Sequence, residues 1–209
     1  MKRTTMWIGG IAVAGLAALL VRRLRGGACP SWFSFVLDNP VTRRYAGAER
    51  LMRYMDLRPG MRVLDAGCGP GRLAIPFARR VGPRGEVVGL DLQADMLRRL
   101  DARVRREGLE NVHPLQGGLG EGALEGQEQF DRAVLVTVLG EIRDKAAALA
   151  ELFARLKPGG LLLVTEALPD PDFLLPRRVE RLAGETGFTL HASHGCFPAY
   201  TRVFCKPEL

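Results

Sequence analysis

The stretch Leu64–Arg72, which reads LDAGCGPGR, places three glycines on alternate positions directly after a short apolar run. Glycine loses more backbone entropy than other residues when it is held in one conformation, so such a cluster needs a physical reason. Gly67, Gly69 and Gly71 are therefore expected to form a tight loop after a strand. In such a loop a ligand approaches the backbone too closely for side chains to be accommodated.

The pattern on either side of this loop predicts an α/β domain. From Met61 onward, short apolar runs alternate with stretches of helical periodicity, and this alternation is typical of a parallel sheet with helices on both faces. Doubly wound sheets bind ligands at the carboxyl ends of their strands, and the glycine loop follows the first apolar run. The runs read RVLDAG, EVVGLD, NVHPLQG, FDRAVLVTV and GLLLVTE.

The glycine spacing separates the candidate ligands. A Walker loop ends in a lysine and a hydroxyl residue, and neither is present. A dinucleotide fingerprint needs its third glycine where Arg72 stands, whereas the chain reads D-x-G-x-G-x-G from Asp65 to Gly71. Asp91, which ends the second run, is an acid suited to the two hydroxyls of a ribose. These features indicate a ligand with a ribose and without a pyrophosphate.

Four successive motifs, VLDAGCGPG, VVGLDLQADML, FDRAVLVTV and LKPGGLLLVTE, resemble those of class I S-adenosylmethionine-dependent methyltransferases. The resemblance covers Leu57 to about Pro207, because GFTLHASHG and AYTRVFCKP are similar to the terminal antiparallel hairpin of that fold. It implies a doubly wound, Rossmann-like, mostly parallel seven-stranded sheet and S-adenosyl-L-methionine as the cofactor. The chain is similar to the broad group that includes quinone C-methyltransferases.

The resemblance also implies which residues hold the cofactor. Asp65 is expected near its amino group, Leu92 against the adenine, and Cys68 in packing without chemistry. The family usually places an acid near the adenine amino group where this chain has Gly118, so adenine recognition is expected to use backbone groups or Gln116. The full set of expected cofactor contacts is Asp65, Gly67, Cys68, Gly69, Gly71, Asp91, Leu92, Gln116, Gly118, Val136 and Thr137.

Two acids are the candidates for a catalytic or substrate-orienting role. Methyl transfer from a sulfonium is an in-line displacement, and a general base is needed only when the acceptor is protonated. Glu141 follows the fourth run and Glu166 ends the fifth, so both are expected to face the acceptor. The alternatives are a charge at a helix start for Glu141 and a loop contact for Glu166. No metal is expected, because His191, His194 and Cys196 are too few for a structural zinc site.

The segment before the domain predicts a membrane anchor. Eighteen uncharged residues, 4–21, lie between basic flanks, and in a helix they reach ~27 Å, which is enough for a thin hydrocarbon core. Arginines directly after the run argue against a cleaved signal peptide, and the positive-inside rule puts the rest of the chain in the cytoplasm. The sequence therefore predicts a single-pass anchor over residues 1–26, a helical cap over 27–58 and the methyltransferase domain over 59–209. An interfacial helix is the alternative to the anchor.

Charge and composition bear on the partners. Residues 1–53 hold nine basic and two acidic side chains, which accounts for the whole net charge of +7. A basic segment beside a membrane explains this better than a nucleic-acid face, and the segment VTVLGEIRD lacks the N-P-P-Y type motif of related nucleobase methyltransferases. No nucleic-acid partner is therefore expected. The four cysteines form no C-x-x-C pair, and the absence of a disulfide framework is typical of a reducing cytosol.

The acceptor is expected to be lipid-soluble or membrane-associated. The predicted domain is close to the minimum for its fold, so the segment before Leu57 is expected to form the wall of the acceptor pocket. The expected acceptor is a quinone, a phospholipid head group or another apolar small molecule. Trp32, Phe33 and Phe35 gather in that segment, and the acceptor is expected to enter past them; the alternative is that these aromatics only pack against the domain. A membrane-tethered cofactor-binding module without catalysis and a nucleotide-dependent oxidoreductase remain as alternatives.

Overall fold

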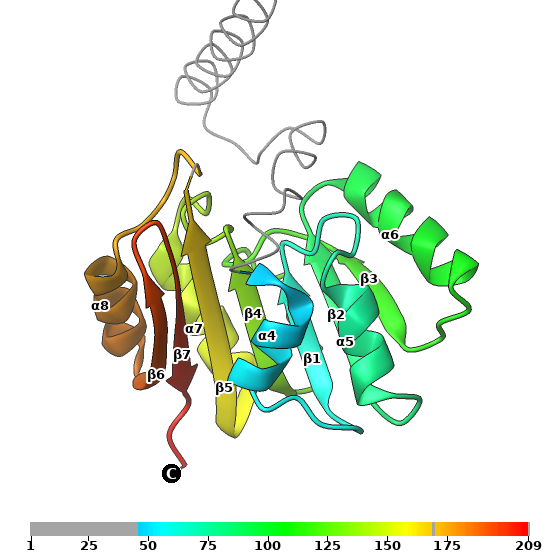
Figure 1. Ribbon diagram of the computed structural model, residues 1–209, viewed down its shortest axis with the longest axis horizontal. Coiled ribbons are helices and arrows are strands. Elements are labelled where there is room, and N and C mark those ends of the chain that lie inside the picture. Colours follow the sequence, from blue (N-terminus) through cyan, green and yellow to red (C-terminus); the bar gives the residue numbers. More distant parts are fainter. Residues whose placement is uncertain (1–45, 169, 209) are drawn as a thin grey trace, which may run out of the picture.

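The computed structural model describes residues 46–168 and 170–208, and these contain a single seven-stranded sheet. The strands are β1 (Arg62–Ala66), β2 (Glu86–Asp91), β3 (Val112–Gln116), β4 (Phe130–Val136), β5 (Leu156–Ala167), β6 (Thr189–Cys196) and β7 (Ala199–Cys205). They lie in the order β3-β2-β1-β4-β5-β7-β6 (Figure 1). Neighbours pair in parallel except β7, which runs antiparallel to both β5 and β6. The predicted α/β fold, with its mostly parallel sheet and terminal antiparallel pair, is therefore confirmed.

Strand β1 lies where the strand order reverses. It pairs with β2 on one side and β4 on the other, so that Asp65 lies opposite both Gly89 and Val134. Connections that leave such a position toward opposite faces diverge, and ligands of doubly wound sheets bind in the space between them. The glycine loop follows β1 directly. The topology thus puts the loop where this fold binds ligands.

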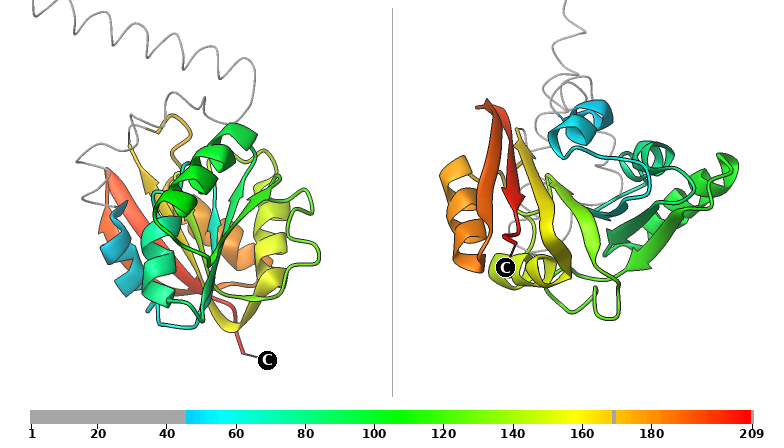
Figure 2. Two further views of the ribbon diagram at one scale, coloured as in Figure 1. Left: turned by 90° about the vertical axis from the view of Figure 1, so that its right-hand side faces the viewer. Right: turned by 90° about the horizontal axis from the view of Figure 1, so that it is seen from below.

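Helices cover both faces of the sheet (Figure 2). Buried side chains of α4, α5 and α6 belong to one hydrophobic core, and those of α7 and α8 belong to the core on the opposite face. Each helix buries apolar residues at helical spacing and exposes its charges, as an element on a sheet surface must. Their bounds are α4 (Ala48–Tyr54), α5 (Ala74–Val81), α6 (Ala94–Arg106), α7 (Lys145–Arg155) and α8 (Pro176–Thr186).

Helix α4 connects the segment before the first strand to the sheet. Its Leu51 and Met52 are buried in the same core as α5, while Arg53 is exposed. The ring of Tyr54 stacks on His194 of β6, with ring centroids 3.6 Å apart and an interplanar angle of 2°. The apolar side of this helix therefore covers the sheet as far as its antiparallel edge.

The membrane prediction requires a correction. Among the described residues, none of the helices combines the length and the apolar character that crossing a bilayer requires. The predicted anchor at residues 1–26, and most of the predicted cap at 27–58, lie outside the residues that the structure describes. A hydropathy run predicts only that a helix over it would be long enough to span a bilayer. The predicted single-pass membrane location with a cytoplasmic catalytic domain is therefore wrong.

Candidate active site

Two of the three loop glycines are required by the surrounding protein. Gly67 and Gly71 both have positive φ angles, +74° and +81°, which side chains rarely adopt. A Cβ at Gly67 would clash with the Val138 side chain, and one at Gly71 would clash with Leu100. The amide of Gly67 donates to the Leu90 carbonyl at 2.8 Å, which holds the start of the loop against β2. Packing and backbone conformation thus account for these two glycines.

Gly69 needs a different explanation. Its φ is +51°, yet no described atom lies within 4 Å of the position that its Cβ would take. Its amide donates to Oδ2 of Asp91 at 2.9 Å, so the tip of the loop is fixed against the end of β2. The middle glycine therefore faces open space at the carboxyl edge of the sheet, and that space is where the expected cofactor would approach.

Asp91 presents a carboxylate that is oriented before any ligand arrives. Its Oδ2 accepts from Gly69, and its Oδ1 accepts from the amide of Gln93 at 2.9 Å. Each carboxylate oxygen can accept a further hydrogen bond, so both can receive a ribose hydroxyl. The next residue, Leu92, has 54% of its surface exposed, which is unusual for a side chain of this type. An acid for a ribose and an apolar surface for a base thus stand side by side.

Asp65 is a buried acid with an unsatisfied oxygen. The residue is 3% exposed, and its Oδ2 has no hydrogen-bond partner among the described residues. Burial raises the pKa of Asp65 to about 7, although the positive charge of Arg72 and the amide of Ala74 act in the opposite direction. A cationic amino group would satisfy this oxygen and favour its ionised form. The residues that are present therefore fit S-adenosylmethionine, which carries both a ribose and an ammonium group.

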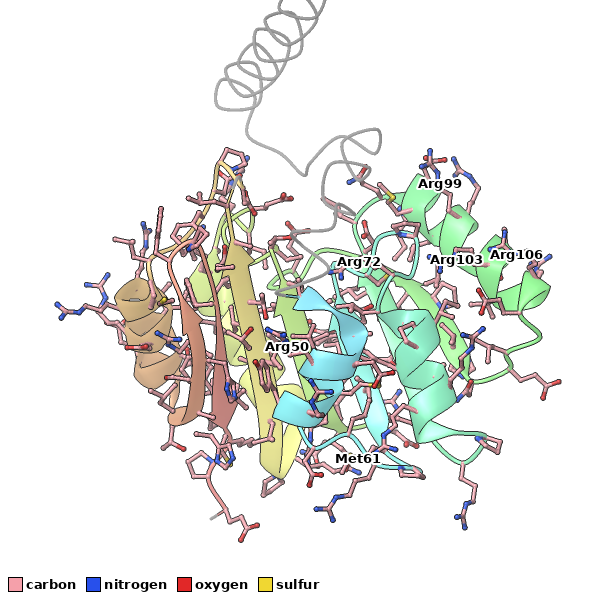
Figure 3. The ribbon with its side chains drawn as sticks, viewed as in Figure 1. Arg50, Met61, Arg72, Arg99, Arg103 and Arg106 are labelled. Atoms are coloured by element: carbon pink, nitrogen blue, oxygen red, sulfur yellow. The ribbon has the colours of Figure 1, made fainter. Side chains whose placement is uncertain are left out.

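Cys68 and Arg72 are held by contacts with other parts of the protein. The Cys68 thiol is buried and lies against the Cα side of Gly89, and burial raises its pKa above the ordinary range. A thiol in this state is inert, as expected for packing. Arg72, just after the loop, donates to the carbonyl of Ala46 at 2.7 Å, at the start of the described chain (Figure 3). The loop is thus joined to the segment that leads into α4.

The end of β3 provides the remaining surface for the base. Gln116 is exposed, stands opposite Asp91 in the register, and its Nε2 donates weakly to the Leu92 carbonyl at 3.5 Å. Gly118 follows after a further residue, and the space that a side chain there would take is filled by the carboxyl group of Glu121. The acid that the family places at this position is absent, and a different acid stands in its place.

The end of β4 has a strained backbone. Thr137 is buried and has a φ of +55°, which is a genuine outlier for a β-branched residue. Its amide donates to the Thr165 carbonyl of β5 at 2.8 Å, and this bond holds the conformation. Val136, just before it, is 9% exposed. Such strain persists where the surrounding structure enforces it, and it clusters at ligand sites.

Glu166 and Glu141 lie in one acidic group at the ends of β4 and β5. Glu166 is fully buried, and neither carboxylate oxygen has a hydrogen-bond partner among the described residues. Burial raises its pKa to about 8, and the charges of Asp170 and Glu141 add to that effect. Nearby backbone amides of Leu174 and Gly140 lower the pKa by less. Glu166 is therefore a neutral acid near pH 7.

Sequence reasoning missed two members of this group. Asp170 and Asp172 place carboxylate oxygens within 4.8 Å of one another and of Glu141. Both belong to the segment PDPD after the fifth apolar run, where two acids alternating with prolines are a signal of a shaped loop. The predicted entry residues Trp32, Phe33 and Phe35 lie outside the described residues.

Comparison with known proteins identifies the family. The family described as "Methyltransferase domain" matches residues 57–183. A demethylmenaquinone methyltransferase of Bacillus cytotoxicus is 36% identical over 124 residues, which are 59% of this chain and 52% of that protein. A ubiquinone/menaquinone biosynthesis C-methyltransferase of Vibrio vulnificus is 40% identical over 110 residues, 52% of this chain and 42% of that protein. The matched region thus spans about half the length of these curated relatives.

Solved structures agree on the fold. An S-adenosylmethionine-dependent methyltransferase from Aquifex aeolicus superimposes with a TM-score of 0.75 at 19% identity, over 86% of this chain and all of that one. The predicted cofactor, S-adenosylmethionine, is confirmed by these comparisons and fits the residues of the glycine loop and Asp91. The chain therefore belongs to the methyltransferase domain family, and its recognition from four sequence motifs as a class I S-adenosylmethionine-dependent methyltransferase is confirmed.

Proposed function

We propose that this chain transfers a methyl group from S-adenosylmethionine to a small, apolar, quinol-type acceptor, through a catalytic domain over residues 59–209. The observation that carries the proposal is the pairing of Gly69 with Asp91. A glycine faces open space at the loop tip, and its amide orients a carboxylate whose two oxygens can each accept another bond. This arrangement fits the ribose of a nucleoside-containing cofactor such as S-adenosylmethionine.

The roles of the chain's own residues follow from these surroundings. When bound, S-adenosylmethionine supplies a methyl group on a positively charged sulfonium. Asp91 binds the ribose hydroxyls, Leu92 packs on the base, and Asp65 pairs with the amino group of the methionine part. Val136 and Thr137 would lie beside the methyl group, and the hydrogen bond from the Thr137 amide to Thr165 would keep that part of the site in place. Positioning of this kind lowers the barrier of a displacement because the reacting groups meet in line.

The acidic group is assigned to accept the hydroxyl proton of the acceptor. Glu141 is partly exposed, and we assign it to contact the acceptor and to receive its hydroxyl proton. Glu166 is buried behind it and acts as a positioning residue, because a neutral acid there limits the negative charge around Glu141. An acceptor that has lost its hydroxyl proton is a stronger nucleophile at its ring carbon. After that carbon takes the methyl group and the methyl–sulfur bond breaks, the hydrogen on the same carbon leaves as a proton and the ring becomes aromatic again.

An apolar acceptor is supported by two observations. The similar proteins from Bacillus cytotoxicus and Vibrio vulnificus are named for quinone methylation. In this chain Leu175 and Phe197 are 66% and 73% exposed, and both follow strands that end at the carboxyl edge of the sheet, β5 and β6. Exposed apolar side chains on the edge that carries the glycine loop supply a surface for an apolar ring.

Labelled methyl transfer tests the proposal. The full chain is incubated with methyl-labelled S-adenosylmethionine and either a short-chain demethylated naphthoquinol or a water-soluble catechol, and the products are identified by mass. We expect labelled product from the quinol at a rate that Asp91→Ala reduces at least tenfold, because hydrogen bonds to a charged group contribute about 1.5–3 kcal/mol.

Three results would contradict parts of this proposal. Cofactor binding without transfer to any acceptor would identify a binding module. Binding of a nicotinamide dinucleotide in preference to S-adenosylmethionine would identify an oxidoreductase. Transfer to the catechol alone would support the methyltransferase activity and contradict the apolar acceptor.

A further inference from the structure

We infer that the carboxylate of Glu121 accepts a hydrogen bond from the exocyclic amino group of the cofactor's adenine. Glu121 lies in the loop after β3, three residues beyond Gly118. The inference rests on the proposed function, because it concerns how S-adenosylmethionine is held. It gives a role to an exposed acid outside the sequence-predicted site, in the loop after β3.

The space beside Gly118 locates the Glu121 carboxylate. The φ of Gly118 lies outside the left-handed region, so its backbone conformation would allow a side chain. A Cβ there would nevertheless lie 2.6 Å from Cδ of Glu121 and closer still to Oε2. A turn brings the two residues together, because the amide of Glu121 donates to the Gly118 carbonyl at 3.1 Å. The carboxylate of one residue thus fills the side-chain space of the other.

This space adjoins the nucleoside site. Gln116 pairs with Asp91 in the parallel register, and the amide of Gly117 donates to the Asp91 carbonyl at 3.2 Å. A nucleoside whose ribose bonds to Asp91 and whose base packs on Leu92 would bring that base to the end of β3, on the side of Gly118. The loop therefore brings Glu121 to the rim of the base, while the sugar stays with the acid of β2.

The chemistry of Glu121 selects an amino group. Within the described residues its carboxylate has no hydrogen-bond or salt-bridge partner, and it carries acceptors only. The 6-amino group of adenine is a donor that such an acceptor can bind. The 6-oxo group of hypoxanthine is itself an acceptor and is repelled by a carboxylate. Discrimination between these two bases is therefore the property that Glu121 controls.

Calorimetry with two product analogues tests this role without any turnover. The full chain is titrated with S-adenosylhomocysteine and with S-inosylhomocysteine, in which a 6-oxo group replaces the 6-amino group and N1 carries a hydrogen. We expect Glu121→Ala to weaken binding of the adenosine compound about tenfold or more, and to reduce the preference for it over the inosine compound by a similar factor.

A matched control and a rescue separate recognition from loop stability. Glu125 forms the same kind of turn with Gly122, with a backbone bond of 3.0 Å, but stands four residues further from the end of β3. Glu125→Ala is therefore expected to leave both affinities within twofold. The double variant Gly118→Asp with Glu121→Ala places an acid in the vacated space and is expected to restore the adenine preference. A merely structural role for Glu121 predicts no such rescue.

The outcomes are distinguishable from failure of the proposed function. If the unmodified chain binds neither analogue, the proposed cofactor site fails. If it binds the adenosine compound and Glu121→Ala keeps both affinity and base preference, the inference about Glu121 is overturned. Loss of preference in Gln116→Ala instead would transfer the role to that amide.

Discussion

At the scale of single residues, Gly69 differs from its loop neighbours because none of the described atoms excludes a side chain there. Gly69→Ala places a side chain at a φ of +51°, which costs about 1–2 kcal/mol of stability, and it fills the space of the cofactor. We expect S-adenosylhomocysteine affinity to fall at least tenfold by calorimetry. Gly108 is a matched control, with a φ of +62° and equally open surroundings. Gly108→Ala should lose similar stability and keep its affinity; equal affinity loss in both variants would refute the assignment.

Asp65 makes cofactor binding dependent on pH. Its pKa of about 7 means that the buried carboxyl group is partly protonated near neutrality. An ammonium group beside it lowers that pKa, so binding at pH 7 should release on the order of half a proton and should tighten from about pH 6 to about pH 7.5. Calorimetry in two buffers with different ionisation enthalpies measures the proton release. Asp65→Asn should bind more weakly and release none, and undiminished release from that variant would assign the proton to another group.

How far the sequence predicts the site depends on how local each contact is. The glycine loop and Asp91 are predictable because backbone conformation and residue spacing define their roles. Glu121 is not, because its carboxylate reaches the end of β3 only through a turn that leaves no mark in the residue pattern. Asp170 and Asp172 meet Glu141 across two loops, and contacts between loops do not follow from periodicity.

At the scale of elements, α4 is held by packing more than by its own length. A helix of seven residues is too short to be stable alone, so its buried side chains must supply the stability. Leu51 is fully buried, and Leu51→Ala should lower the free energy of unfolding by about 2–5 kcal/mol. Arg53→Ala, on the exposed side, should change it by less than about 0.5 kcal/mol. Denaturant titration measures both, and equal effects would mean that α4 does not cover the core.

The strands are the most predictable elements, and their ends are the least. Continuous apolar runs mark the buried parallel strands because both of their faces are covered. Strand β5 nevertheless begins at Leu156, ahead of its apolar run, and passes through the glycines of LKPGG. Glycine and proline ordinarily predict a break, but pairing with β4 across a register shift continues the strand there.

At the scale of the whole molecule, two raised pKa values predict the pH dependence of stability. Asp65 and Glu166 have pKa values of about 7 and about 8 in the folded chain, against ordinary values of 3.8 and 4.5. Between the ordinary and the raised pKa values, the folded state therefore binds more protons than the unfolded state. The free energy of unfolding is therefore highest at a pH below the ordinary pKa values, and it falls as the pH rises toward 8. We expect a decline of a few kcal/mol in the free energy of unfolding, measured by urea titration across this range.

Replacing the more strongly shifted acid tests the cause of this decline. Glu166→Gln removes a group that must ionise in a buried place, so the variant should lose much of the decline between about pH 4.5 and about pH 8. Glu125→Gln, an exposed acid, should keep the full decline. A Glu166→Gln profile parallel to that of the unmodified chain would show that the decline arises elsewhere.

The position of β7 in the sheet has a consequence for synthesis of the chain. This strand follows β6 in sequence but lies between β5 and β6. Strand β6 therefore leaves the ribosome before the strand that pairs with it, and β5 presents an open edge until that strand arrives. An open edge is a template for strands of other chains. Translation that halts before Ala199 should thus produce a chain that aggregates. Once the seven-residue strand Ala199–Cys205 has paired, the nascent domain no longer offers an open edge to strands of other chains.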